Sequence, residues 1–315
     1  MFGGVGGQAV AGSPQNPAKG EAALSRTAEA ELKAARERLS KAEIGPLGTA
    51  RSTHFQAIGD ASEWFMSVVL RDCEQITSEY LRHFRARGFQ LRMPGSPLIV
   101  IVFRNDQSFD KFFHMPSRRK AAKEDRLAYW EGIYDQTTNA LHVFDWRDMF
   151  PHSGRLNAYT LVHELTHQLS FNTGLLNREG DTPACIAEGL GMYGEARDII
   201  GPSDFGRCNW IRLSAITTSL RRLPWIPMRD LFSDDVILRS GKGDWVLLAY
   251  GESWLLVYYF LKDQALLPRF REYLKAIRPR RTSDYRIADA QTHLGDLDQL
   301  DRVLRQYAVQ LERPH

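Results

Sequence analysis

The spacing of apolar residues predicts strands in the first half of the chain. Residues 54–58 form a short strand candidate, and the uninterrupted apolar run at 97–103 has the β-branched content of a buried strand. Between them, large apolar side chains recur at three- and four-residue steps from Phe65 to Phe84. This periodicity predicts an amphipathic helix that ends near Gly88.

A β-hairpin is predicted over residues 132–145, with its turn near 136–139. Because successive side chains of a strand point to opposite faces, Leu141 and Val143 are expected on one face and Phe144 on the other. His142 shares the face of Phe144, and we expect it to be a surface histidine of the strand rather than a substrate contact.

Helical periodicity prevails in the second half of the chain. The predicted helices cover residues 156–171, 183–197, 210–220, 246–261, 267–277 and 297–311. A strand-containing half followed by a helical half predicts an α+β fold, in which a small mixed or antiparallel sheet precedes a helical lobe.

This order predicts three segments. Residues 1–50 are expected to be a disordered or solvated helical N-terminal segment, because residues 21–43 are helical in composition but have few large apolar side chains. We expect that helix to lie outside the core. Residues 51–150 would form a strand-containing subdomain, and residues 151–315 a helical lobe with the functional site.

The helix predicted at 156–171 contains the motif His163-Glu164-Leu-Thr-His167. Residues four apart lie on one face of a helix, so both imidazoles can reach one metal ion. Glu164 is rotated away from them and can act on a water at the open side of the metal. The alternative is an ordinary buried helix whose histidines have hydrogen-bond partners.

A second helix is predicted to return beside the first, because turn residues fill the gap before it. It starts at Thr182-Pro183, with a capping hydroxyl and a proline in the first turn. Glu188 and Glu195 lie two turns apart on one face, and Gly191 between them allows close approach. Glu188 would complete a His₂Glu zinc site, while Glu195 would hold the second nitrogen of a ligand histidine. Surface carboxylates are the alternative.

These motifs resemble those of the gluzincin metallopeptidases, which include thermolysin and the M1 aminopeptidases. M1-like members carry an EGxxxYxE pattern, seen here as Glu188, Gly189, Tyr193 and Glu195. The resemblance further implies that a tyrosine some sixty residues later steadies the transition state, and Tyr250 fits that place.

The chain also resembles the peptidase MA-like, DUF1570-type proteins over residues 53–312, including a closing segment at 294–300. The resemblance implies a zincin-like fold. Two departures stand out. No glutamate in the hairpin at 132–145 matches the amine-binding one of M1 aminopeptidases, and Cys185-Ile-Ala precedes Glu188 without the usual tryptophan. The first departure favours internal cleavage of peptides, and Cys185 is expected to be a buried packing residue.

Composition narrows the function classes further. A net charge of +3 gives no case for nucleic-acid binding, and we expect the basic run at 278–281 to be solvated surface rather than a recruitment patch. Cys73, Cys185 and Cys208 are far apart, which indicates no cysteine metal site, although one disulfide stays an alternative. No transmembrane segment or signal peptide is visible, and compartment and oligomeric state stay unknown.

The sequence therefore predicts a zinc-dependent hydrolase acting on a peptide or protein substrate, most simply an endopeptidase. Its metal ligands would be His163, His167 and Glu188, with Glu164 and Tyr250 as catalytic residues. The alternatives are a binding or scaffold domain that keeps the metal without turnover, and a hydrolase of a non-peptide amide.

Overall fold

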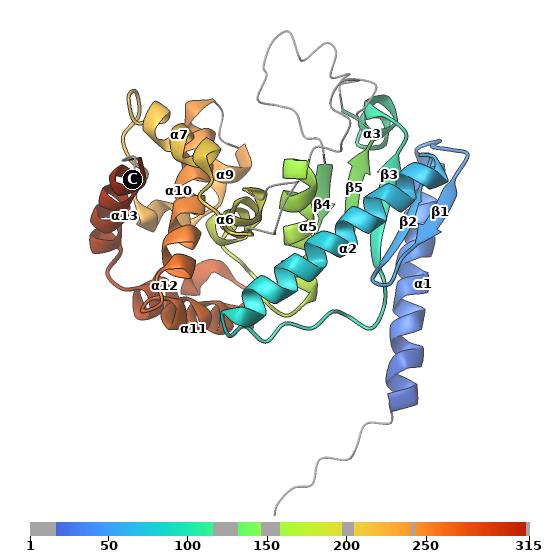
Figure 1. Cartoon of the computed structure of the whole chain (residues 1–315), viewed down its shortest axis with the longest axis horizontal. Helices are drawn as coiled ribbons and strands as arrows, with labels where there is room; N and C mark the ends of the chain where they lie inside the picture. The colour runs from blue at the N-terminus through green and yellow to red at the C-terminus, as the bar shows by residue number, and fades with distance from the viewer. Residues whose placement is uncertain (1–16, 116–131, 146–157, 197–204, 241–242, 313–315) are drawn as a thin grey trace, which may run out of the picture.

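A five-stranded mixed sheet has the strand order β1-β2-β3-β5-β4 in the computed structural model (Figure 1). The model describes residues 17–115, 132–145, 158–196, 205–240 and 243–312. The strands are β1 (Gly48–Arg51), β2 (Phe55–Gly59), β3 (Leu98–Phe103), β4 (Gly132–Asp135) and β5 (Ala140–Phe144). Strands β2, β3 and β5 are parallel, while β1 and β4 pair antiparallel at the two edges. The predicted strands and hairpin are confirmed.

Helices cover both faces of this sheet, which explains why every residue of β3 is buried. On one face lie α2 (Glu63–Ala86) and α5 (Ala158–Asn172), and on the other lie α1 (Pro17–Lys41) and α3 (Asp106–Phe112). The side chains of β5 alternate as predicted between the two apolar cores. Leu141 and Val143 join the core under α2 and α5, and Phe144 joins the core under α1 and α3.

Two expectations about this region are wrong. The C-terminal part of α1 belongs to the core, since Ala35 and Leu39 are fully buried against the sheet. One leucine and one alanine a helical turn apart are enough to pack this end of the helix on the sheet, so a low content of large apolar residues did not exclude it. His142 is also fully buried, between Phe103 and the aromatic rings of α3, because helices cover this face too. The segment boundaries at residues 50 and 150 stay predictions, and residues 1–16 lie outside the described ranges.

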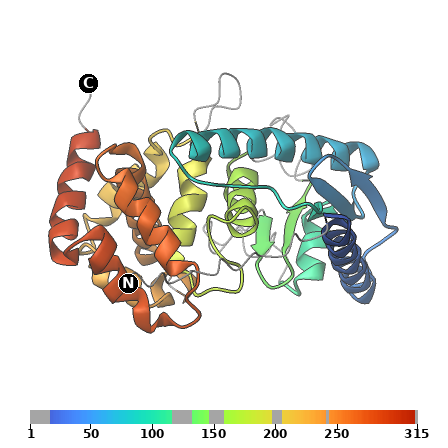
Figure 2. The same ribbon diagram turned by 90° about the horizontal axis from the view of Figure 1, so that it is seen from below.

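The second half of the chain is helical, so the α+β prediction is confirmed (Figures 1 and 2). The predicted helices appear as α5, α6 (Ala184–Glu195), α7 (Trp210–Ser219), α10 (Asp244–Lys262), α11 (Leu267–Ile277) and α13 (Leu297–Glu312). Three shorter helices were not predicted: α8 (Met228–Ser233), α9 (Val236–Ser240) and α12 (Arg286–Leu294). They have too few turns for a periodic signal. No described helix is long and apolar enough to cross a membrane.

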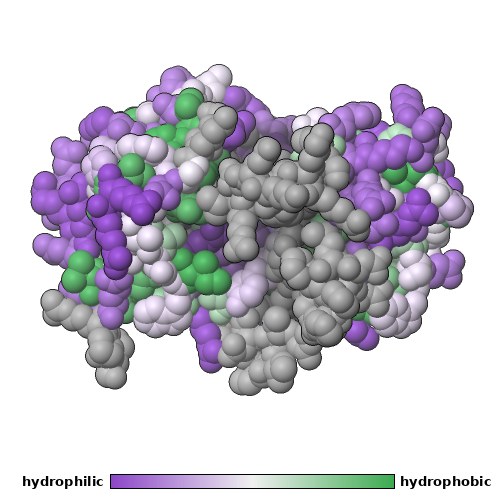
Figure 3. All heavy atoms as spheres, turned by 90° about the horizontal axis from the view of Figure 1, so that it is seen from above, coloured by the Kyte–Doolittle hydropathy of each residue, from purple (hydrophilic) through white to green (hydrophobic). Residues whose placement is uncertain are grey.

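Helix α6 lies between α5 and α10, which joins the helical half to the sheet. The approach to α10 is very close, because a Cβ at Gly189 would stand 2.4 Å from the carbonyl oxygen of Ser253. Only glycine fits there. In the space-filling view of Figure 3, polar surface prevails and smaller apolar patches appear over the helical half. The close contact on one side of α6 leaves its other side to face α5.

Candidate metal centre

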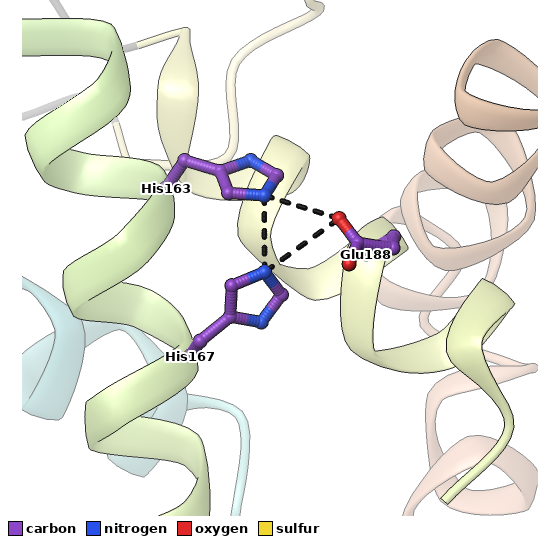
Figure 4. Close-up of side chains that lie close together, drawn as sticks. All are labelled: His163, His167 and Glu188. Carbon is purple, nitrogen blue, oxygen red and sulfur yellow. Dashed lines mark hydrogen bonds and ion pairs between the residues drawn. The ribbon is translucent and has the colours of Figure 1, made fainter. Parts of the chain in front are cut away.

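His163 and His167 project from one face of α5 toward Glu188 of α6 (Figure 4). Nε2 of His163 lies 3.0 Å from Nε2 of His167 and 3.1 Å from Oε2 of Glu188, and Nε2 of His167 lies 3.6 Å from the same oxygen. Three ligand atoms therefore converge on one point, as the motif spacing predicted. Among the described residues, no other group of three or more histidine, cysteine or acidic side chains meets in this way.

The donor set fits a small divalent cation. Tetrahedral ligands about 2.05 Å from a common ion are separated by about 3.3 Å, which is the spacing of these three atoms. Charge gives a second argument. With neutral imidazoles, the carboxylates of Glu164, Glu188 and Glu195 outnumber the guanidinium of Arg212 by two. One divalent cation would balance this partly buried excess, since charges withdrawn from solvent are normally paired or bound to metal.

Glu195 holds the outer nitrogen of His163. Its Oε1 lies 2.8 Å from Nδ1 of the ring, and the carboxylate is almost completely buried. A proton on Nδ1 leaves the lone pair of Nε2 directed at the cluster, which is the form that binds metal. Gly191 makes this possible, since a Cβ there would stand 2.9–3.0 Å from the imidazole of His163. The contact predicted for Glu195 is thus present.

Two residues that the sequence did not single out hold Glu195 in turn. Nε and Nη2 of Arg212 donate to Oε2 and Oε1 at 3.0 and 2.7 Å, and Nδ2 of Asn209 donates to Oε2 at 2.8 Å. Both residues lie at the start of α7, where Asn209 also caps the helix by accepting from the backbone N–H of Arg212. The sequence offers one local signal here, since an asparagine before a helix is a typical N-cap. That signal does not reveal that Asn209 also binds Glu195.

The electrostatics of the cluster favour charge separation. Burial opposes the protonated form of His163, but hydrogen bonds to Glu188 and Glu195 outweigh it and raise its pKa to about 10. Burial likewise opposes the ionised form of Glu195, yet His163 and Arg212 lower its pKa to about 2. The pKa of Glu188 is lowered because the histidines outweigh the same burial effect. The site thus stabilises a positive charge at the point where the ligand atoms meet.

Glu164 lies beside the cluster without joining it. Its Oε2 accepts a hydrogen bond of 2.7 Å from the backbone N–H of Tyr134 in the edge strand β4. Burial raises the pKa of this carboxyl, against the opposing charges of His163 and His167. The strand therefore fixes a half-buried carboxylate next to the three ligand atoms.

Tyr250 lies in the first turns of α10 and is half-buried. The guanidinium of Arg212 stands 5.6 Å from the centre of its ring. The charge of Glu188 raises the pKa of Tyr250, and burial adds to the effect. The arginine that holds Glu195 therefore also contacts the ring of Tyr250.

Other expectations are resolved more simply. Cys185 is fully buried outside the metal cluster, and all three cysteines are free. The start of α6 is not capped by Thr182 as predicted. Instead Oδ1 of Asp235 accepts from the backbone N–H of Ala184 at 2.9 Å, and Arg286 holds Asp235 in place. A carboxylate from a distant segment replaces the local hydroxyl.

Fold and site together define an α+β protein with a candidate His₂Glu metal centre. Residues 157–282 match the model of the DUF1570 family, described as a protein of unknown function. The matched residues include the whole ligand cluster together with Glu195, Arg212 and Tyr250. A comparison with curated proteins gives no match.

Proposed function

We propose that this protein is a zinc-dependent peptidase that cleaves internal peptide bonds. The observation that carries the proposal is the arrangement of four carboxylate and imidazole groups. Three ligand atoms converge, and the carboxylate of Glu164 is held beside them by Tyr134. A purely structural zinc site has four protein ligands, and the described residues supply three.

His163, His167 and Glu188 would hold the zinc, which when bound supplies Lewis-acid polarisation of the scissile carbonyl and makes an attacking water more acidic. Glu164 accepts the proton of that water and delivers it to the nitrogen of the amide as the C–N bond breaks. Tyr250 donates a hydrogen bond to the carbonyl oxygen as that oxygen gains negative charge. Glu195 keeps His163 oriented throughout.

The edge of the sheet offers a place for an extended peptide. Strand β5, which contains Leu141, cannot take this role, because it is paired on both sides. Strand β4 is the edge, and the N–H of Tyr134 already points outward to Glu164. A peptide paired along β4 would place its carbonyl groups beside the cluster. No glutamate of β4 or β5 is available to bind a peptide amine, which favours internal cleavage.

Glu164→Gln tests the proposal, because it keeps the shape of the side chain and removes the base. The variant should keep one zinc per chain and lose peptide cleavage by about 10²–10⁴-fold. His163→Ala should lose both, and elemental analysis with mass spectrometry of digested peptides reads out the two properties. Wild-type protein that binds no zinc, or that removes only single N-terminal residues, would contradict the proposal.

A further inference from the structure

A basic hollow of about 800 Å³ lies beside the C-terminal end of α5. Two segments form most of it: residues 176–179, which connect the two helices of the metal cluster, and residues 275–281, which include the last turn of α11 and the chain that follows it. Four cationic side chains line the hollow together with one acidic side chain. The cations are Arg178, Lys275, Arg278 and Arg281, and the acid is Glu179.

The positive charge of this hollow is poorly compensated. Arg178 lies 3.7 Å from Glu31, Lys275 lies 3.6 Å from Glu272, and Arg281 lies 3.9 Å from Glu179. All three pairs are long, and those of Lys275 and Arg281 are largely solvent-exposed, so these two contribute little. No ion pair joins Arg278 to an acidic side chain in the described ranges. The hollow therefore attracts negative charge.

The basic segment is also held in a fixed position. Nδ2 of Asn177 donates to the carbonyl of Arg278, and the backbone N–H of Asp181 donates to the carbonyl of Arg280, both at 2.9 Å. The guanidinium of Arg280 is turned away to Asp289, to which it donates two hydrogen bonds. The remaining cations thus face the hollow from an ordered backbone, which lowers the entropy cost of binding.

Contacts link the hollow to the proposed catalytic base. Phe171 lines the hollow, and its ring stacks on the ring of Tyr134 at a centroid distance of 6.0 Å. The backbone N–H of the same tyrosine holds Glu164. Two residues further along the chain, Nε2 of Gln136 donates to the carbonyl of Arg178 at 2.5 Å. Since a strand advances about 3.3 Å per residue, the hollow begins only a few residues from the base.

We propose that this hollow binds an acidic stretch of the peptide substrate a few residues from the scissile bond. The inference rests on the proposed peptidase function and names its substrate class. Carboxylates would meet Lys275, Arg278 and Arg281, while Phe171 and Leu176 give apolar contact to a neighbouring side chain. A peptide is favoured over nucleic acid because the chain as a whole carries a net charge of only +3 and apolar side chains also line the hollow.

Fluorescence anisotropy with labelled twelve-residue peptides tests the inference. One peptide carries four glutamates and the other carries glutamine at the same positions. The full chain with Glu164→Gln is used, so that turnover does not consume the probe. Lys275→Gln/Arg278→Gln/Arg281→Gln should weaken binding of the acidic peptide about tenfold or more and leave the neutral peptide unchanged. The control Arg71→Gln/Arg222→Gln/Arg302→Gln removes the same charge from exposed positions elsewhere and should change binding less than twofold.

Two further measurements keep the outcomes separate. In the protein with an intact hollow, raising NaCl from about 50 to 500 mM should weaken binding of the acidic peptide and leave binding of the neutral peptide unchanged. Equal affinity for the two peptides would overturn the inference, and so would a hollow variant that loses binding of a single-stranded oligonucleotide but keeps that of the acidic peptide. Neither of these two results would bear on the zinc and cleavage assays, which test the proposed function. Conversely, a protein without zinc would overturn the proposed function and leave the anisotropy result unchanged.

Discussion

Arg212 and Glu195 form a two-point ion pair, in which both oxygens of the carboxylate accept from one guanidinium. Oε1 of Glu195 also lies 2.8 Å from Nδ1 of His163. Glu195 thus links Arg212, at the start of α7, to His163, the proposed zinc ligand on α5. Such outer contacts fix the orientation and tautomer of a ligand histidine, so the pair is expected to act on metal affinity.

Arg212→Gln should lower zinc affinity about 10–100-fold, because Asn209 is then the one residue of α7's start that still holds Glu195 against His163. Competition with a chromophoric chelator measures the affinity. Glu195→Gln should have a similar effect, and the double variant should lose little more than either single one, since both act through His163. Arg221→Gln, an exposed arginine near the far end of α7, is the matched control. Unchanged affinity in Arg212→Gln would remove this arginine from the site.

Two glycines of α6 allow the metal contact and the packing contact to be separated. A Cβ at Gly191 meets the imidazole of His163 at 2.9–3.0 Å, whereas a Cβ at Gly189 meets the backbone of Ser253 at 2.4 Å. Of the two variants, Gly191→Ala should therefore have the larger effect on zinc affinity. Gly189→Ala should have the larger effect on the melting temperature of the metal-free chain, because the backbone of Ser253 cannot move aside. Chelator competition and thermal unfolding of both variants provide the comparison, and identical profiles would contradict it.

Glu252 makes the stability of the fold depend on pH. The side chain is fully buried in α10, its Oε1 accepts from the N–H of Ile226 at 3.1 Å, and its Oε2 has no hydrogen-bond partner in the described part of the chain. Burial raises the pKa of this carboxyl to about 9. From about pH 4.5 upward the unfolded chain releases the proton while the folded chain keeps it, so stability falls until the pH passes about 9.

Glu252→Gln resembles the protonated carboxyl and should abolish this loss. In the presence of a chelator, its melting temperature should exceed that of the wild type by about 5 °C or more at pH 8, with little difference near pH 5. Differential scanning fluorimetry across this range measures the effect. Glu272→Gln, at an exposed position of α11, should leave the pH profile unchanged. A wild-type stability that does not fall between pH 5 and pH 8 relative to Glu252→Gln would contradict the raised pKa.

The ligand cluster could be predicted because its geometry is local. His163 and His167 are fixed by one turn of helix, and Glu188 follows from a motif on a helix that returns beside them. Arg212 could not be found in this way. Its contact with Glu195 depends on how α7 packs against α10, which is a matter of tertiary structure.

The fold shows the same division between local and distant determinants. Strands and long helices were predicted from period and length, since each carries its own apolar face. The cap of α6 was not, because it comes from Asp235, 51 positions after Ala184. The burial of Leu39 on α1 likewise depends on strands that follow α1 in the sequence.

Tyr250→Phe gives the sharpest test of the catalytic proposal, because the change keeps the ring and deletes one donor. If the hydroxyl stabilises the oxyanion, its contribution belongs to the transition state, so kcat should fall about 10²–10³-fold while KM changes little. The ring still packs against Arg212, and the melting temperature should therefore stay close to that of the wild type. A purely structural tyrosine predicts the opposite, with near-normal turnover and a loss of about 1 kcal/mol in stability. Zinc content should be the same in either case, since Tyr250 is not part of the ligand cluster. Wild-type kcat on a well-cleaved peptide would exclude Tyr250 from the mechanism and leave the roles of His163 and Glu164 standing.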